Sequence, residues 1–314
     1  MKTKINIGTR GSPLALAQAE LLASALRRTY PHLAAPDAIN FVIITTTGDR
    51  IQDRPLSEVG GKGLFTKEIE EALLDGSIDA AVHSMKDMPT ELPQGLVIPC
   101  LLPREDVRDA FFSRTGASID ELPQGAVVGT SSLRRQAILL ARRPDLKVVM
   151  FRGNVGTRLQ KLQDGVVDAT LLAVAGMNRL GKADVIQQVI DPEIMLPAVA
   201  QGAVGIEIRE SDADMHKLLA PIHCPVTELR VTAERAYLAA MDGSCKTPLA
   251  ALMSVPDPQN RVRFDALSAN PDGTGLHRVS YVMEVLHTGD AERLGRQAAA
   301  DIRAQMATAA KTRA

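Results

Sequence analysis

The stretch EALLDGSIDAAVHSMKDM, residues 71–88, has a counterpart of equal length in QKLQDGVVDATLLAVAGM, residues 160–177. Each copy ends a helix at Asp-Gly, reaches Asp-Ala two residues later, continues as a short apolar run and closes on methionine. Glycine is a usual stop after a helix, and a short apolar run behind it is typical of a buried strand. The repetition predicts two related α/β units, although Asp-Gly turns and alternating strands can also coincide by chance.

Outward from this pair, the chain alternates between strand-like and helix-like segments. Ser12 is a natural N-cap and Pro13 suits the first helical position, so a helix is expected over residues 14–26. Further helices are expected at 64–76, 131–143 and 155–165, and strands at 4–9, 41–47, 78–83, 126–130, 146–151, 169–174 and 203–208. Such alternation favours mainly parallel sheets with helices on the outside.

The segment at 203–208 marks where we expect the chain to cross back into the first unit. The predicted domains are therefore domain 1 (α/β), residues 1–102 and 203–221, and domain 2 (α/β), residues 103–202. A smaller α+β domain 3 is expected at 222–314. It would contain a helix at 226–240, strands at 249–255, 261–269 and 277–287, a last helix from about 290 and a frayed tail at 306–314.

Composition narrows the class of protein. The 314 residues carry 36 lysines and arginines against 37 acids, a net charge of −1, which argues against a nucleic-acid coat. No run approaches the ~18 apolar residues of a membrane span, and no apolar region follows the charged start. Cys100, Cys224 and Cys245 lie far apart, which excludes a disulfide framework or zinc ribbon and indicates a reducing cytoplasm. The scattered histidines suggest no metal cluster.

Arginine stands at three predicted helix starts, where acidic residues are the norm. A helix N-terminus carries partial positive charge, so each cation there costs ~0.3–1 kcal/mol. Free amides, the helix dipole and a guanidinium together form an anion site. Any one arginine could equally pair with a surface acid, but the three starts together favour an anionic ligand, either a phosphate or a carboxylate. The residues are Arg10, Arg134, Arg135, Arg152 and Arg158.

The segment GGKGLFT, residues 60–66, does not form a phosphate loop. Leu56 and Gly63 stand where the Walker pattern needs glycine and Ser or Thr. Lys62 is therefore interpreted as a cation on a mobile lid or, equally, on a plain surface loop.

Asp87 follows a predicted buried strand, at the end where open α/β sheets place ligands. It could donate a proton or balance a cation, and among arginines we expect it to be ionised. The simpler interpretation, that it pairs with Lys86 or caps the turn before Pro89, is slightly favoured from the residues alone. His83 is expected to be structural.

Cys245 lies just beyond a predicted helix C-terminus, whose dipole disfavours a thiolate. It therefore does not look like a nucleophile used at every turnover. It could be an exposed covalent tether, but a small buried apolar side chain is the more frequent role.

Eight segments in this order resemble the porphobilinogen deaminase (hydroxymethylbilane synthase) family of tetrapyrrole and heme biosynthesis. They are GTRGSPLALAQ, VGGKGLFTKEIE, AVHSMKDMP, GTSSLRRQ, RGNVGTRLQKL, LAVAGMNRLG, AQGAVGIE and DGSCKTP. The resemblance implies a cytoplasmic, monomeric transferase of three domains. Its first two domains would be periplasmic-binding-protein-like, with the active cleft between them.

The family's activity follows from the same resemblance. Four porphobilinogen molecules are condensed head to tail with loss of ammonia, and 1-hydroxymethylbilane is then released by hydrolysis. The units are added to a dipyrromethane cofactor, built from the substrate and joined by a thioether to a cysteine of the third domain. No nucleic acid or membrane partner is expected. A non-catalytic anion-binding module is the second hypothesis and a phosphate-handling transferase the third.

The resemblance also implies roles for single residues. Cys245 would carry the cofactor and Asp87 would be catalytic, its charge stabilising the cation left when ammonia departs. Cofactor carboxylates would be held by Ser84, Lys86, Thr130, Ser131, Arg134, Arg135 and Arg158. Incoming substrate would meet Arg10, Ser12, Gln18, Arg152, Arg179 and Gln201, with Lys62 on a lid at 47–63. Three positions depart from the family pattern, namely Glu58, Ala200 and Ser244.

Overall fold

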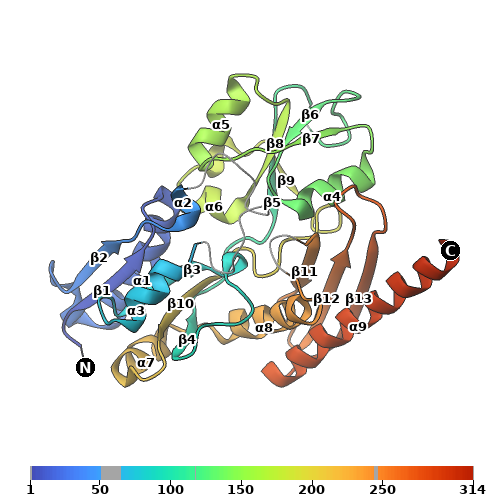
Figure 1. Ribbon diagram of the computed structural model, residues 1–314. Coiled ribbons are helices and arrows are strands. Elements are labelled where there is room, and N and C mark those ends of the chain that lie inside the picture. The colour runs from blue at the N-terminus through green and yellow to red at the C-terminus, as the bar shows by residue number, and fades with distance from the viewer. Residues whose placement is uncertain (1, 51–64, 117, 244–246, 314) are drawn as a thin grey trace. The chain divides into compact units, whose positions relative to one another are not determined.

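The computed structural model (Figure 1) describes residues 2–50, 65–116, 118–243 and 247–313. The chain divides into two compact units, each discontinuous in sequence. Unit 1 comprises Met1–Glu105 and Gly202–Thr227, and unit 2 comprises Asp106–Gln201 and Glu228–Ala314.

The sheet of unit 1 has the strand order β2-β1-β3-β10-β4. Strand β1 pairs in parallel with β2 and β3, whereas β10 is antiparallel to both β3 and β4. Strand β10, which follows the second passage between the units, lies between β3 and β4 in this sheet. The bounds are β1 Ile5–Thr9, β2 Ile39–Ile43, β3 Ala80–Ser84, β4 Leu96–Leu101 and β10 Val204–Arg209.

Helices cover both faces of this sheet. Helix α1 (Pro13–Thr29) starts as predicted, since the Ser12 hydroxyl accepts the Ala15 N–H at 3.2 Å and Pro13 occupies the first helical position. Its Leu22 and Leu26 share one core cluster with Leu218 of α7 (Ala213–Leu219). Helix α3 (Lys67–Leu74) packs on the other face, and the chain leaves it through Gly76 at φ 83°. The short helix α2 spans Thr47–Arg50, and 3-10 turns lie at Pro31–Ala34, Met85–Asp87 and Ala220–Ile222.

Unit 2 repeats this sheet. Its strand order is β7-β6-β8-β5-β9, with β6 parallel to β7 and β8, and β5 antiparallel to β8 and β9. Both sheets therefore have the same sequence of strand directions, as the internal repeat predicts. The bounds are β5 Asp109–Ser113, β6 Val127–Gly129, β7 Lys147–Val149, β8 Ala169–Ala173 and β9 Gln188–Ile190, with helices α4 Leu133–Arg142, α5 Val155–Gln163 and α6 Val174–Arg179 and a 3-10 turn at Ala183–Val185.

Each sheet is mixed in detail: four of its strands run in one direction and one strand, β10 or β5, runs against them. Each has two parallel and two antiparallel pairings. The alternation of strands and helices reports the parallel strands, since a parallel neighbour needs a helical crossover. Strands β5 and β10 follow the two passages between the units instead, and they enter their sheets in the opposite direction. The chain thus has two α/β units and a smaller antiparallel sheet, in agreement with the expected fold class.

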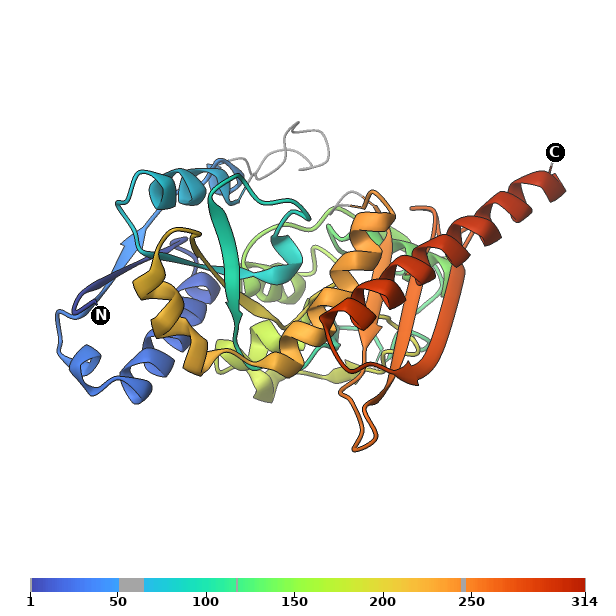
Figure 2. The same ribbon diagram turned by 90° about the horizontal axis from the view of Figure 1, so that it is seen from below.

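The remainder of unit 2 is a three-stranded antiparallel meander with two helices. Strands β11 (Leu249–Met253), β12 (Arg261–Ser268) and β13 (His277–Glu284) pair in this order. Figure 2 shows α8 (Pro225–Ala240) and α9 (Thr288–Arg313) beside the meander. Buried Ala250 and Leu267 of the meander share a core cluster with Leu139 of α4.

The prediction of a frayed tail at 306–314 is wrong, because α9 continues to Arg313. The tail is rich in alanine, the strongest helix former. Two of its hydroxyls also bond back one turn, from Thr308 to the Ala304 carbonyl at 3.0 Å and from Thr312 to the Thr308 carbonyl at 3.1 Å. These bonds satisfy the two hydroxyls within the helix, where they would otherwise bond to water.

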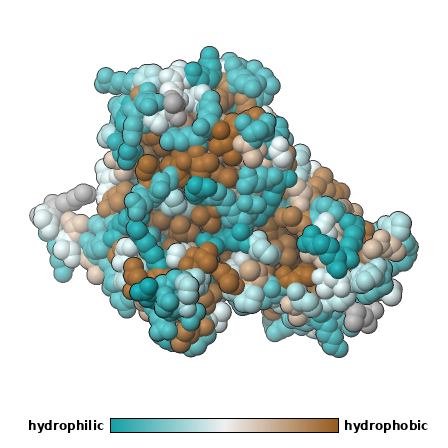
Figure 3. Space-filling view, turned by 180° about the vertical axis from the view of Figure 1, so that it is seen from behind, coloured by the Kyte–Doolittle hydropathy of each residue, from teal (hydrophilic) through white to brown (hydrophobic). Residues whose placement is uncertain are grey.

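Among the residues that the structure describes, no helix is both long and apolar enough to cross a membrane. The face drawn in Figure 3 carries hydrophilic residues between its apolar patches.

Helices α8 and α9 touch through Gly295. A methyl group at this position would lie 2.2 Å from the Ala233 carbonyl oxygen and 2.8 Å from the Tyr237 amide nitrogen. Glycine to alanine in an exposed helix normally stabilises by ~1 kcal/mol. We expect Gly295→Ala instead to lower the free energy of unfolding by about 1–3 kcal/mol, as overpacking does. Urea unfolding of the variant and of the parent protein measures this difference in the free energy of unfolding.

Gly289→Ala is the matched control in the same helix. Its added methyl would meet the His287 side chain, at 3.2 Å, rather than backbone. Equal effects of the two substitutions would mean that the helices are not packed through Gly295.

Candidate active site

Unit 1 has a pocket at the carboxyl end of β3, where open α/β sheets bind ligands. The strand ends at Ser84, and the 3-10 turn Met85–Asp87 follows directly. The pocket therefore combines Ser84 and Asp87 of this short segment with Arg10, Ala15 and Gln18 of the β1–α1 region. Its lining residues are Arg10, Ala15, Gln18, Phe65, Thr66, Ile69, Val82, His83, Ser84, Asp87 and Met88.

Arg10 is held on two sides. Its Nε lies 3.1 Å from each carboxylate oxygen of Asp49, and its guanidinium carbon lies 4.2 Å from the centre of the Phe65 ring. Burial alone would raise the pKa of Asp49, but the bonds from Arg10 and Thr46 outweigh it and hold that pKa below its usual value. A ligand carboxylate that bound Arg10 would either share its guanidinium group with Asp49 or displace Asp49 from it.

Gln18 and Ser84 are brought together in this pocket. The amide of Gln18 donates to the Ser84 hydroxyl at 2.7 Å. Asp87 is exposed at the rim, so water and ligand can reach its carboxylate. Two other predicted residues do not line this pocket in the described part of unit 1: Ser12, whose hydroxyl caps α1, and half-buried Lys86.

In unit 2, the start of α4 is organised by three successive hydroxyls. Thr130 accepts the Ser132 N–H at 3.2 Å, and Ser132, which the sequence analysis did not single out as a site residue, caps the helix by accepting the Arg135 N–H at 3.4 Å. The exposed Ser131 donates to the Phe151 carbonyl at 3.0 Å. This bond ties the start of α4 to the segment that leads into α5.

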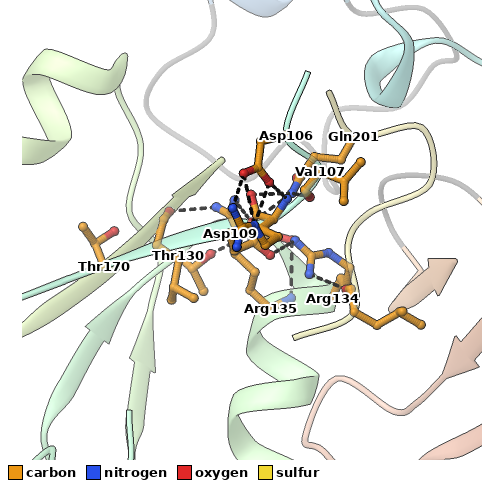
Figure 4. A network of polar contacts seen from close by, with 12 residues as sticks. Asp106, Val107, Asp109, Thr130, Arg134, Arg135, Thr170 and Gln201 are labelled. Atoms are coloured by element: carbon orange, nitrogen blue, oxygen red, sulfur yellow. Dashed lines mark hydrogen bonds and ion pairs between the residues drawn. The ribbon is translucent and has the colours of Figure 1, made fainter. Parts of the chain in front are cut away.

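Arg134 and Arg135 turn toward a carboxylate of the chain itself (Figure 4). Arg134 Nη2 lies 2.7 Å from Asp109 Oδ2, and Arg135 Nη2 lies 2.6 Å from Asp109 Oδ1. Each arginine also donates to a backbone carbonyl, Arg134 to Leu196 at 2.7 Å and Arg135 to Leu171 at 2.8 Å. Both side chains are buried. The carboxylate of Asp109 therefore neutralises part of their charge inside the unit.

Asp109 was missed by the sequence analysis. It is fully buried at the start of β5, and Gln201 also donates to its Oδ1 at 3.2 Å and to the Val107 carbonyl at 2.7 Å. Burial would raise the pKa of Asp109, but the two arginines outweigh it and hold the pKa far below its usual value. The sequence did contain a signal for this role: Asp109 directly precedes the apolar run AFF, and a charged residue buried with such a run needs a partner.

Three arginines of unit 2 repel one another. Burial and then the like charges of Arg135 and Arg152 lower the pKa of Arg158 to about 10. Arg158 lies in the first turns of α5, which is capped by Asn154, and its Nε donates to the Gly153 carbonyl at 2.8 Å. Like charge gathered near a helix start favours the binding of an anion.

Arg179 has a different setting. It lies in the last turn of α6, where a cation is favourable for the helix itself. Ala200, one of the three departures, adopts φ 58°, a left-handed conformation that suits glycine better, and its N–H donates to Glu234 at 2.7 Å. Lys62, Cys245, Glu58, Ser244 and residues 51–63 of the expected lid lie outside the described residues.

Two family models match the chain. Residues 5–217 match "Porphobilinogen deaminase, dipyromethane cofactor binding domain", and residues 228–304 match "Porphobilinogen deaminase, C-terminal domain". The chain belongs to the porphobilinogen deaminase family.

Curated relatives agree with this membership. A porphobilinogen deaminase from Paracoccus denitrificans is 60% identical, with 86% of this chain and 85% of that protein covered. A chloroplastic porphobilinogen deaminase from Oryza sativa subsp. japonica is 54% identical, with 88% and 77% covered. Among solved structures, an ABC transporter periplasmic substrate-binding protein from Coxiella burnetii is similar at 15% identity and TM-score 0.43, covering 71% of this chain and 93% of its own.

The Asp109 network predicts a large stability effect. Asp109→Asn leaves two buried guanidinium groups without their counter-charge, so we expect the free energy of unfolding to fall by about 3–5 kcal/mol in urea. The folded pKa of Asp109 is lowered, so its contribution is complete above the unfolded value of ~3.9 and is lost as pH falls through the folded pKa. The variant should therefore lose less stability on acidification than the parent.

Asp120→Asn is the control, because Asp120 pairs with Arg142 at the surface. We expect a loss of ~0–1 kcal/mol for it. If the two variants unfold at the same urea concentration, Asp109 does not carry the charge balance assigned to it.

Proposed function

We propose that this protein acts as a hydroxymethylbilane synthase, a transferase of tetrapyrrole and heme biosynthesis. It condenses four porphobilinogen molecules stepwise onto a dipyrromethane cofactor, with loss of ammonia, and releases 1-hydroxymethylbilane by hydrolysis. The observation that carries this proposal is that the like charges of Arg135 and Arg152 act on the buried Arg158 in a chain of this family.

A dipyrromethane suits these residues. Each pyrrole carries an acetate and a propionate, so the cofactor and the growing chain are polycarboxylates. Burial and then the like charges of Arg135 and Arg152 lower the pKa of Arg158, and carboxylates bound at the α5 start would offset both effects. When bound, the cofactor supplies the pyrrole end to which new units are joined.

Asp87 is the proposed catalytic residue. Its carboxylate is exposed at the pocket rim, so it can approach a cation that forms on the substrate when ammonia leaves. An ionised carboxylate placed there stabilises developing positive charge. Arg10 would bind a substrate carboxylate beside it, and the Gln18–Ser84 pair would orient that substrate.

The remaining assignments are proposals of the same kind. Cofactor carboxylates would be held by Ser84, Lys86, Thr130, Ser131, Arg134, Arg135 and Arg158, with the thioether at Cys245. Substrate would meet Arg10, Ser12, Gln18, Lys62, Arg152, Arg179 and Gln201. The buried positions of Arg134, Arg135 and Gln201 favour an additional part for them in holding Asp109.

We also propose the domain division 1–102 with 203–221, 103–202, and 222–314. The separate family match at 228–304 supports the third domain. A monomer in the cytoplasm is proposed with it, supported by the free thiols of Cys100 and Cys224.

Intact mass tests the cofactor. The denatured protein should exceed its sequence mass by two linked pyrroles, because a thioether survives denaturation. Cys245→Ser should abolish the excess, and the control Cys224→Ser should keep it. A fully active protein without added mass contradicts the covalent cofactor.

Single-turnover and steady-state rates test Asp87. Asp87→Glu keeps the charge but moves it by ~1 Å, so we expect kcat to fall on the order of 10²-fold while the added mass remains. Glu91→Asp, an equally small change at an exposed acid nearby, should leave kcat unaltered. An unchanged kcat in Asp87→Glu removes Asp87 from the mechanism.

A further inference from the structure

A buried histidine–carboxylate pair lies behind the unit 1 pocket. His83 Nε2 lies 2.9 Å from Glu207 Oε2, and both side chains are buried. Strands β3 and β10 are antiparallel neighbours in Figure 1, with Gly205 opposite His83 and Ala81 opposite Glu207. The pair is therefore a diagonal contact on one face of the sheet.

Helix α3 covers that face and adds a second carboxylate. Glu70 is only 8% exposed, on a helix whose Ile69 and Leu73 pack with Ala81 in one apolar cluster. Burial is the main cause that raises the pKa of Glu70, and the charge of Glu207 raises it further. Thr66 and His83 act in the opposite direction. Two buried acids thus share the environment of one imidazole.

The cluster of His83, Glu207 and Glu70 is short of hydrogen-bond donors. Within the described chain, Oε1 of the fully buried Glu207 has no hydrogen-bond partner. A buried carboxylate oxygen without a donor is costly, and a retained proton in the cluster reduces that cost. The described residues include no group of three or more His, Cys, Asp or Glu side chains that could hold a metal ion.

Other charged groups near this face have their own settings. Arg209, two residues along β10 from Glu207, donates to the Ile78 carbonyl at 2.7 Å and bonds Asp212 at 3.1 Å. Glu71 on α3 is exposed. From the 3-10 turn, Lys86 is half-buried and Asp87 is exposed. His83 is thus the group that the structure places within hydrogen-bond distance of Glu207.

The cluster also connects to the reacting segment. His83 lines the pocket, and it directly precedes Ser84 and the turn that carries Asp87. That turn is fixed to the β10 side by a second bond, from the Met85 N–H to the Ala203 carbonyl at 3.0 Å. A displacement at His83 would therefore be passed on to Ser84 and Asp87.

We infer that His83, held by Glu207 and faced by Glu70, is a positioning residue that fixes the turn carrying Asp87. This inference rests on the proposed function. Each condensation breaks the C–N bond of an aminomethyl group, forms a C–C bond, and moves the proton released from the attacked carbon to the departing ammonia. Burial raises the pKa of Glu70, so the charge that faces His83 changes with pH, and the pH range in which the Asp87 turn is held correctly changes with it.

The test uses the loaded enzyme, with cofactor content verified by intact mass. Glu207→Gln keeps the shape of the side chain but removes its charge, so the cluster takes up a proton less readily. We expect kcat to fall about 10-fold, KM to stay within about twofold because no cluster residue is placed on substrate, and the acidic limb of the kcat–pH profile to move about one unit lower. Glu70→Gln should move the limb in the same direction.

His223→Gln is the matched control. His223 is a half-buried histidine of the same unit that accepts the Leu101 N–H at 3.2 Å, away from the pocket lining. Its kcat and pH profile should equal those of the parent protein.

The outcomes separate the inference from the proposed function. A parent protein with neither added mass nor bilane formation ends the proposed function. An active parent whose Glu207→Gln and Glu70→Gln variants lose only stability, with kcat and pH profile unchanged, overturns the inference. If Glu207→Gln does not fold, the pH profile of Glu70→Gln decides, because Glu70 contributes no bond between the strands.

Discussion

Positive charge held inside the protein is the constraint on which the second unit depends. Arg134 and Arg135 are buried side by side and can coexist there because Asp109 places one carboxylate oxygen on each. Three charges sum to one excess cation, and Arg152 and Arg158 add to it nearby. This part of the unit therefore holds an excess of positive charge inside a folded core.

The first unit uses the opposite arrangement. Behind its pocket, two buried acids surround one histidine, and Arg10 at the pocket is already matched with Asp49. Acidic side chains thus predominate in unit 1, where a cation is proposed to form, and arginines predominate in unit 2, where carboxylates are proposed to bind. The division suits a reaction in which a polyanionic chain grows by passing through cationic intermediates.

Much of the fold could be predicted from local patterns. The Ser12 cap, the Asp-Gly turns and the apolar runs at β1, β3 and β8 depend on neighbours in sequence, so they were visible there. Strand β4 was missed because Pro99 interrupts its pattern, and β9 because three residues show no period. The site was predicted residue by residue from motif order, but its supporting contacts were not. Asp109 lies 25 residues from Arg134, and His83 lies 124 residues from Glu207, distances over which single-sequence patterns carry no information.

The central place of β10 has a consequence for how the protein is made. Strand β4 has no neighbour in its sheet until β10 arrives, since β10 stands between it and β3. A nascent chain must therefore extend roughly a hundred residues beyond β4 before the first sheet can close, and an isolated N-terminal fragment would expose two open strand edges. Synthesis of this molecule thus includes an interval in which the first half of the chain is made but its sheet cannot close. Chaperone binding or aggregation competes with folding of that half during the interval.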